Sequence, residues 1–341
     1  MNKLTKIGVS ALCGSLASVA AAHAGSLDVT GSATATWSQN EGDNTGNPIG
    51  MNSGITMTGS GELDNGTTFT LTLTQTDATA YSSGNIAITT PSLGTFTIDQ
   101  GGGGTGIDRY DDKMPTAWEE TTGTSLGTGI STVNGAAGST NVEWAVSSDM
   151  LPEGASVYFA VSPRASGNKA TDKAATGGAL EGTGGAWDVA IAHTGLYDGL
   201  ELFGGYSVIT QNHDVATMTG DRRQKVLGAT YAVGGVTFGY QWSEDHVSAA
   251  TAAGTKMYEN NAYGVSFAVN DDLSVSYGLM KSDRVLGNHT STTAEAQSLQ
   301  LSYSMGGASI KVAETQGEDL KYVSGSANDK DATTIALTLA F

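Results

Sequence analysis

Seven charged residues gather in one short stretch of a glycine-rich segment in the first half of the chain. They are, in order, Asp108, Arg109, Asp111, Asp112, Lys113, Glu119 and Glu120. Carboxylates that line a narrow aqueous passage raise the local concentration of cations and repel anions. The same oxygen atoms are the hard ligands that Ca²⁺ prefers. The stretch therefore predicts a charge filter or a cation site, depending on the elements that hold it.

A calcium site would use the three aspartates of this stretch, Asp108, Asp111 and Asp112. Ca²⁺ takes about six to eight oxygen ligands. The spacing differs from that of an EF-hand loop, and acidic loops are commonly just solvated. Bound calcium is thus a secondary expectation for these residues, and we expect no other cofactor.

Phosphate binding and catalysis find little support in the rest of the sequence. Gly101, Gly103 and Gly106 match the spacing G-x-G-x-x-G, but no amphipathic helix follows that would present its N-terminus to a phosphate. The histidines are too scattered to pair as metal ligands on one strand: His193, His213, His246 and His289. No Ser/His pair suited to nucleophilic catalysis is recognisable. The sequence therefore does not indicate an enzyme.

The charged stretch belongs to a segment of about forty residues, 101–140, that lies between two strand-like segments. Connections of this length are uncommon and are either functional or disordered. Tyr110, Met114 and Trp118 give the segment side chains to pack, and disorder is the alternative. Its opening glycines suit a chain that bends sharply at the end of a strand.

Alternation predicts strands on both sides of this segment. At the end of the chain, Ile335, Leu337, Leu339 and Phe341 share one face, and the residues between them are Ala and Thr. The same period of two recurs about sixteen times after residue 25, with Thr, Ser and Gly dominating the second face. This predicts an all-β fold built from an even number of antiparallel strands.

The predicted connections alternate between short and long. Tight turns rich in Gly, Asn and Asp lie at positions such as 64–66 and 234–235, and long polar segments lie at 38–54, 163–186 and 243–261. Short periplasmic turns and long external loops are typical of a transmembrane β-barrel of about sixteen strands. A soluble β-sandwich or repetitive adhesin is the alternative, but its apolar rows would enter a core and its turns would not sort by length.

Residues 1–24 are predicted to be a cleaved signal peptide. Lys3 and Lys6 precede an apolar run, and a small-x-small pattern ends the run at 22–24. The barrel would then comprise residues 25–341. A membrane anchor is the alternative, but the run is short, rich in serine and followed by no basic cluster.

Composition supports an exported chain that does not bind nucleic acid. The only cysteine, Cys13, lies in the leader, so the predicted mature chain has no disulfide to stabilise it. The 34 acids outnumber the 16 Lys and Arg residues, which gives a formal net charge of −18. Nucleic-acid binding needs a basic surface, so we expect no nucleic-acid partner.

The chain resembles a Gram-negative general porin, and most of all the trimeric alphaproteobacterial group. The resemblance rests on the leader, on the hairpin 86–100 that precedes the long segment, and on the terminal Phe341. It implies that 101–140 is the third external loop, which folds into the barrel and narrows the pore. It also implies a homotrimer in the outer membrane, surrounded by lipid and lipopolysaccharide, and an assembly machinery that reads Phe341.

The function that this resemblance implies is passive diffusion of small hydrophilic solutes and ions through a water-filled pore. Inward-facing rows of Thr and Ser fit such a pore because they are small and polar. Two alternatives stay open at this point. One is a solute-selective outer-membrane channel, and the other is a structural or adhesive surface barrel that conducts nothing.

The predicted pore wall departs from the general porin pattern in its charges. No Lys or Arg occurs between Gly25 and Gln100, where general porins place an arginine cluster opposite the acidic loop. Alternation places Glu62, Asp99 and Lys311 on the pore wall, together with the inward acids Asp28, Glu143 and Glu201. We therefore expect a weak preference for cations that decreases at high salt.

The alternative is that basic residues fold over the mouth of the pore and compensate these acids. The candidates are Arg164, Lys169, Lys173, Arg222, Arg223 and Lys225.

Small residues dominate the outward face of the first two strands: Gly31, Ala33, Ala35, Gly59 and Gly61. Lipid tolerates bulky side chains, whereas close protein contacts favour small ones. The face therefore predicts a contact between subunits. Chance is the alternative, because Gly and Ala are common throughout the chain.

Overall fold

The computed structural model describes residues 25–41, 46–77, 82–123, 126–165, 183–211, 219–249 and 251–341. The predicted signal peptide lies outside these residues, as do Lys169 and Lys173. No helix in the described part of the chain has both the length and the apolar character needed to cross a membrane.

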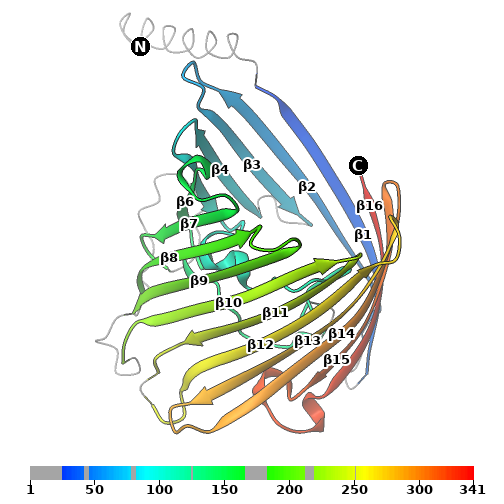
Figure 1. Ribbon diagram of the computed structural model, residues 1–341. Helices are drawn as coiled ribbons and strands as arrows, with labels where there is room; N and C mark the ends of the chain where they lie inside the picture. The colour runs from blue at the N-terminus through cyan, green and yellow to red at the C-terminus, as the bar shows by residue number, and fades with distance from the viewer. Residues whose placement is uncertain are drawn as a thin grey trace, which may run out of the picture.

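The described residues form sixteen antiparallel strands that close into one barrel (Figure 1). The strands are β1 (Leu27–Glu41), β2 (Ile49–Glu62), β3 (Thr68–Thr76), β4 (Ser83–Thr90), β5 (Gly94–Gln100), β6 (Asn141–Val146), β7 (Ala155–Ser162), β8 (Thr183–Thr194), β9 (Leu200–Gln211), β10 (Arg222–Val233), β11 (Val236–His246), β12 (Thr255–Ala268), β13 (Leu273–Leu286), β14 (Ser291–Met305), β15 (Ala308–Glu318) and β16 (Lys330–Ala340). Each strand pairs with its neighbours in sequence, and β1 pairs with β16. The prediction of an all-β, sixteen-stranded antiparallel barrel is confirmed.

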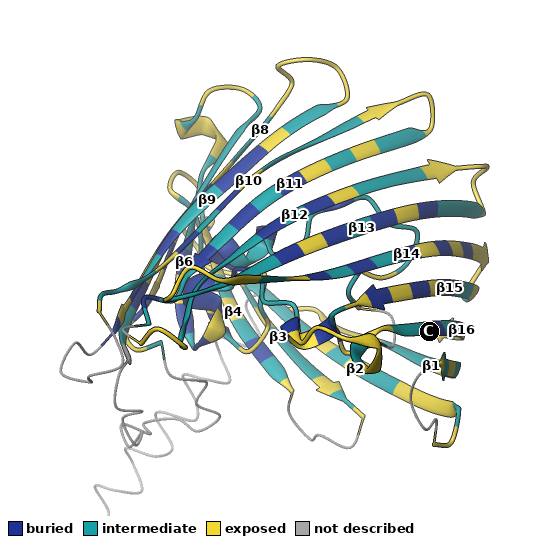
Figure 2. Ribbon diagram, turned by 90° about the horizontal axis from the view of Figure 1, so that it is seen from below, coloured by how far each residue is buried: buried dark blue, intermediate teal, exposed yellow. Residues whose placement is uncertain are grey.

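Alternation along the strands separates the two faces as the sequence predicts. On β3, Phe69 and Leu71 are 42% and 41% exposed on the outer face, while Thr70 and Thr72 lie half-buried on the inner face. Figure 2 shows the same striping of buried and exposed residues along β8 to β15. A closed barrel pairs the backbone groups of every strand, which is the condition for crossing a bilayer.

Several external connections are shorter than predicted because the strands continue beyond their apolar rows. β11 extends to His246 and β12 begins at Thr255, so much of the predicted loop 243–261 is paired strand. Here the outward residues are polar and pair with one another. Lys225 on β10 forms an ion pair of 2.9 Å with Glu244 on β11.

The end of the chain completes the barrel. The backbone N–H groups of Gly31 and Phe341 each donate to the carbonyl of the other, at 2.8 and 2.9 Å. The ring of Phe341 lies over Gly31, where an added Cβ would stand 2.5 Å from the ring. In the same way the ring of Phe69 covers Gly61. Two of the outward glycines are therefore covered by aromatic side chains of their own chain, which gives them a role independent of any subunit contact.

The lengths of the turns and strands determine where the segment 101–140 enters the barrel. β1 ends at the rim of the long connections, and tight turns such as Leu63–Thr67 and Gly234–Gly235 join strands at the other rim. β5 and β6 have 7 and 6 residues, and the segment 101–140 connects them. Because these strands stop early, the segment leaves the wall partway along the barrel.

Candidate functional site

The segment 101–140, which we call the inner loop, folds into the barrel beside β8, β9 and β10 (Figure 1). It contains two short 3₁₀-helices, η1 (Gly106–Tyr110) and η2 (Gly135–Gly138), which contact each other and β7 to β9. Ile107 and Val133 have no exposed surface. The inner loop is therefore packed inside the barrel as predicted, and disorder, the alternative interpretation, does not hold for its described residues.

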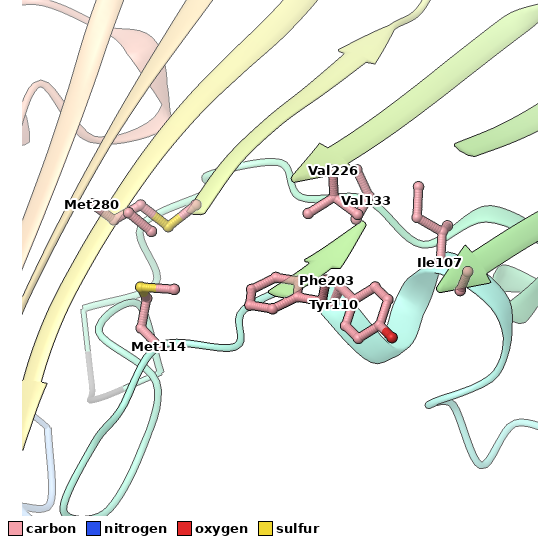
Figure 3. Close-up of a cluster of buried hydrophobic side chains, with 9 residues drawn as sticks. Ile107, Tyr110, Met114, Val133, Phe203, Val226 and Met280 are labelled. Carbon is pink, nitrogen blue, oxygen red and sulfur yellow. The ribbon is translucent and has the colours of Figure 1, made fainter. Parts of the chain in front are cut away.

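An apolar cluster fixes one side of the inner loop to the wall (Figure 3). Tyr110 packs on Phe203 of β9, with ring centroids 4.9 Å apart, and Ile107 packs in the same cluster as Val226 of β10. Glycines on the wall make room for the loop. An added Cβ at Gly205 would lie 2.8 Å from the side chain of Ile107. The apolar side of the loop thus faces β8 to β13.

Glutamine side chains on the wall bind the backbone of the loop. On β10, the Gln224 Oε1 accepts hydrogen bonds from the N–H groups of Asn134 and Gly135, at 3.1 and 2.7 Å. On β11, the Gln241 Oε1 accepts from the N–H of Lys113 at 3.1 Å. Gln224 and Gln241 are 0% and 2% exposed, so both amides are dedicated to this contact.

The tip of the loop is held in the same way on β14. The Gln300 Oε1 accepts from the N–H groups of Trp118 and Glu119, each at 3.0 Å, and its Nε2 donates to the Glu119 carbonyl at 2.8 Å. On the adjacent β15, the Lys311 amine lies 5.9 Å from the centre of the Trp118 ring. The loop therefore crosses the interior from β6 to β14.

One carboxylate joins the two ends of the loop. The Asp188 Oδ2, on β8, accepts from the N–H of Ile107 in η1 at 3.2 Å and from the N–H of Ala136 in η2 at 2.9 Å. The residue is 1% exposed. A buried N–H without an acceptor costs about 1–3 kcal/mol, so Asp188 stabilises the point where both ends of the loop meet the wall.

Wall acids also bind both bases of the loop. The Glu143 Oε2 accepts from Arg109 at 2.5 Å and from the N–H of Gly106 at 2.6 Å. The Arg109 guanidinium lies 3.5 Å from the centre of the Tyr158 ring. Lys113 pairs with Glu201 on β9. The two bases are therefore engaged with the wall and do not offset the acids of the loop.

These contacts correct part of the predicted pore wall. Asp99 and Glu143 face inward as alternation predicts, but they are only 2% and 6% exposed because the loop covers them. Asp99 accepts from the N–H of Gly102 at 3.2 Å. Together with Glu201, these acids fasten the loop instead of lining open water. Glu62 stays exposed at the end of β2.

The acids of the loop stay on its polar side. Glu119 and Glu120 are exposed, and Asp108, Asp111 and Asp112 are half-buried. Although the Glu120 side chain is partly exposed, the protein around its carboxyl removes enough water to raise the pKa to about 7, and the charges of Asp111, Asp112, Glu119 and Asp108 raise it further. These acids thus lie close enough to repel one another.

Burial also raises the pKa values of Asp108 and Asp112, both to about 6. The N–H of Gly104 donates to Asp108 at 2.7 Å, and that of Met114 to Asp112 at 3.0 Å, and both bonds act against the rise. Burial raises the pKa of Asp111 as well. The charge on this side of the loop consequently varies with pH near neutrality.

The wall opposite the anchored side is polar and accessible. Inward residues of β1 to β4, such as Thr34, Thr58 and Thr72, are half-buried, whereas inward Ser207 and Gln224 beneath the loop have no exposed surface. The accessible space inside the barrel therefore lies between the acidic side of the loop and the hydroxyl groups of the first strands.

Four of the bases expected to compensate the acids are described by the structure. Arg164 is exposed just beyond the end of β7, and the other three lie on β10. Arg222 pairs with Asp245 at 2.5 Å, and Lys225 pairs with Glu244 on the outer face. Arg223 is exposed on the outer face of β10, in register with His246. Their charges are thus separated from the acids of the inner loop.

A family model described as Gram-negative porin matches residues 8–340 of the chain. The chain belongs to the Gram-negative porin family. No curated protein sequence matches it closely enough to count as a relative.

Solved porins show the same fold at low identity. OmpF of Salmonella typhi, in a complex with daunomycin, is 14% identical over 92% of this chain and 97% of its own, with a TM-score of 0.69. A loop-deletion variant of OmpT of Vibrio cholerae is 12% identical over 93% and 99%, with a TM-score of 0.64. A variant of the porin of Rhodobacter blastica is 16% identical over 93% and 100%, with a TM-score of 0.58.

Family membership decides several predictions at once. The protein is a β-barrel of the Gram-negative outer membrane and a non-enzymatic diffusion channel. The prediction that it is not an enzyme is therefore confirmed by the family. The calcium site at Asp108, Asp111 and Asp112 stays a prediction. The described ranges contain no group of three or more His, Cys, Asp or Glu residues arranged to hold a metal, so the geometry adds no support to it.

Sequence reasoning did not identify which inward residues anchor the porin's inner loop. Asp188, Gln224, Gln241 and Gln300 stand on inward positions, where most neighbours are Ser, Thr, Ala or Gly. A long polar side chain in such a row is a usable signal for a bound loop. Their partners, however, are backbone groups, which carry no sequence signature.

Replacing Asp188 with Ala should loosen the inner loop, because two buried N–H groups lose their acceptor at a cost of about 1–3 kcal/mol each. We expect a larger and noisier single-channel conductance in planar bilayers. Asp188→Asn keeps an acceptor oxygen and serves as the control with near-normal conductance. Identical traces for Asp188→Ala and the natural protein would contradict the anchoring role.

The permeability of the porin to cations relative to anions should increase with pH. The carboxyls of Asp108, Asp112 and Glu120, with pKa values of about 6 to 7, are largely protonated at about pH 5 and ionised at about pH 8. The negative charge beside the passage therefore rises across this range. Reversal potentials in a KCl gradient at a series of pH values measure it, and a flat profile would show that these groups do not face the permeating ions.

Proposed function

We propose that this porin is a water-filled channel for small hydrophilic solutes and ions that prefers cations to anions. The observation that carries the proposal is an unequal pairing of charges. Both bases of the inner loop bind wall acids, through Arg109–Glu143 and Lys113–Glu201, and the loop's five acids form no ion pair with a base among the described residues.

The opposite wall adds no positive charge to balance these acids. The chain has no Lys or Arg between Gly25 and Gln100, which covers β1 to β5. Lys311 on β15 is an inward base close to the tip of the loop, beside Trp118. Carboxylates next to a narrow aqueous passage with low-dielectric walls concentrate cations, which supports the proposed preference.

One alternative predicted from the sequence differs from this proposal in a measurable way, because a solute-selective channel would show saturable transport of one solute. The other, a structural or adhesive barrel that conducts no ions, does not agree with a family of diffusion channels. An accessible inner wall on β1 to β4 favours conduction. The closer relationship to the alphaproteobacterial porins also stays a prediction, because porins of Rhodobacter and Salmonella align with this chain at similar identities, 16% and 14%.

Neutralising the exposed acids of the loop tests the preference. In a KCl gradient we expect the natural protein to shift the reversal potential toward that of K⁺. The double variant Glu119→Gln/Glu120→Gln should lower the K⁺/Cl⁻ permeability ratio about threefold or more, since both charges face the passage. Salt near molar concentration should weaken the effect, because the Debye length falls to about 3 Å.

A matched control removes two exposed acids elsewhere. Asp149→Asn/Glu153→Gln lies at the connection between β6 and β7, on the rim of short turns. This variant should keep the natural permeability ratio. An anion-selective natural protein, or equal shifts in both double variants, would overturn the proposal.

We propose a homotrimer as the assembly, in line with the usual state of this family. Ala33 lies on the outer face of β1, in register with Leu339 of β16 and Ser53 of β2. Gly31 and Gly61 are covered by Phe341 and Phe69, so the uncovered small residues beside them carry the argument for a close contact.

Replacing Ala33 with Trp should weaken the trimer, because a bulky ring would hold two close-packed backbones apart. Samples are incubated at a series of temperatures and then run on a gel without boiling. The trimer band of Ala33→Trp should disappear at a lower temperature than that of the natural protein. Trp at Leu227, an outward residue of β10 that is 61% exposed, is the control expected to leave the band unchanged. A trimer of natural stability in Ala33→Trp would place the contact elsewhere.

A further inference from the structure

The wall opposite the acidic loop has a chemistry of its own, which the cation preference does not use. Inward hydroxyl groups on β1, β2, β3 and β16 pair across neighbouring strands. Thr34 and Thr338 place their Oγ1 atoms 3.0 Å apart, and Thr56 and Thr74 place theirs 3.4 Å apart. All four residues are half-buried, so the groups reach the accessible space.

Each hydroxyl pair keeps free hydrogen-bonding capacity. A hydroxyl group has one donor and two acceptor lone pairs, and one bond between two hydroxyls uses only one donor and one acceptor. Each pair therefore still offers one donor and several acceptors to the passage. Because these groups are uncharged, they can replace the water around a solute's hydroxyl groups without holding the solute by charge.

The same inward parity also occurs beneath the loop, but there the hydroxyls are hidden. Ser298 and Thr315 pair at 3.2 Å, and both are only 1% exposed. This pair is thus hidden where the loop covers the wall, whereas the pairs on β1, β2, β3 and β16 stay accessible on the side that faces the acids. A solute in between would meet carboxylates on one flank and hydroxyls on the other.

We propose that the passage favours hydroxylated organic cations, such as amino sugars and amino alcohols, over cations of similar size without hydroxyl groups. The proposal rests on the cation preference proposed above and adds a substrate class to it. The ammonium group lies toward Glu119 and Glu120, and the solute's hydroxyls exchange their water for the Thr34–Thr338 and Thr56–Thr74 pairs. A cation with an alkyl surface loses its surrounding water there without such an exchange.

Bi-ionic reversal potentials of the full chain in planar bilayers test this at about pH 8, where the loop acids are ionised. The probes are N-methylglucammonium, which is hydroxylated, and tetraethylammonium, which is not, each measured against K⁺. After correction for mobility in bulk water, we expect the permeability of N-methylglucammonium to exceed that of tetraethylammonium by about threefold or more. Equal corrected permeabilities in the natural protein would overturn the inference without any variant.

A quadruple variant locates the effect on the wall. Thr34→Val, Thr56→Val, Thr74→Val and Thr338→Val replace both members of each pair by side chains of the same shape, which leaves no unpaired partner. The advantage of N-methylglucammonium should disappear while the K⁺/Cl⁻ ratio stays natural. Thr89→Val/Thr95→Val, which removes both members of a hydroxyl pair 2.8 Å apart beside the short turn between β4 and β5, is the matched control and should keep the advantage.

The two proposals fail in different ways. A natural protein without preference for K⁺ over Cl⁻ overturns the proposed function. A natural protein that prefers K⁺ but treats the two organic cations alike overturns only the substrate class, as does an unchanged advantage in the valine variant.

Discussion

The backbone of the inner loop has no strand to pair with, and its need for hydrogen bonds organises the inside of the barrel. A strand partner would satisfy these groups in a regular ladder, but here many of them bind side chains of the wall instead. Asp188, Gln224, Gln241 and Gln300 supply the bonds, and each serves two or more backbone atoms of the loop. The position of the constriction follows from where these four side chains stand.

This anchoring determines the electrostatics as well as the shape. Glu143 and Glu201 bind the two bases of the loop at the wall, so each favourable ion pair removes one acid and one base from the passage. The acids that remain lie on the polar side of the loop, partly buried and close to one another. The raised pKa values of Asp108, Asp112 and Glu120 are the consequence of that crowding and burial. Positive and negative charges therefore nearly balance where the loop is anchored to the wall, whereas the charge that the loop presents to the water is mainly negative.

Closure of the barrel places a second requirement on the first strands. Gly31 and Gly61 leave gaps on the outer face that the rings of Phe341 and Phe69 fill. Each glycine, which stabilises a strand poorly because it has no side chain, thereby gains an apolar contact. For Phe341 the same position also completes backbone pairing with Gly31. Part of the small-residue face is therefore explained within one chain, and the remaining small residues, Ala33 among them, are those that a neighbouring subunit would contact.

Much of the fold could be predicted from the sequence, because each requirement behind it is local. A strand between lipid and water needs an apolar residue at every second position, and turns of a few residues need Gly, Asn or Asp, so alternation such as Ile335 to Phe341 predicted the barrel and its strand count. The length and packing residues of 101–140 likewise predicted an inner loop. The sequence also placed the inward acids on the correct face. It did not decide which acids meet water, since Asp99, Glu143 and Glu201 are covered or paired only once the loop lies on the wall. That outcome, like the anchoring by Asp188, depends on contacts between residues far apart in sequence, such as Trp118 and Gln300, which are 182 positions apart, and only the tertiary structure brings such residues together.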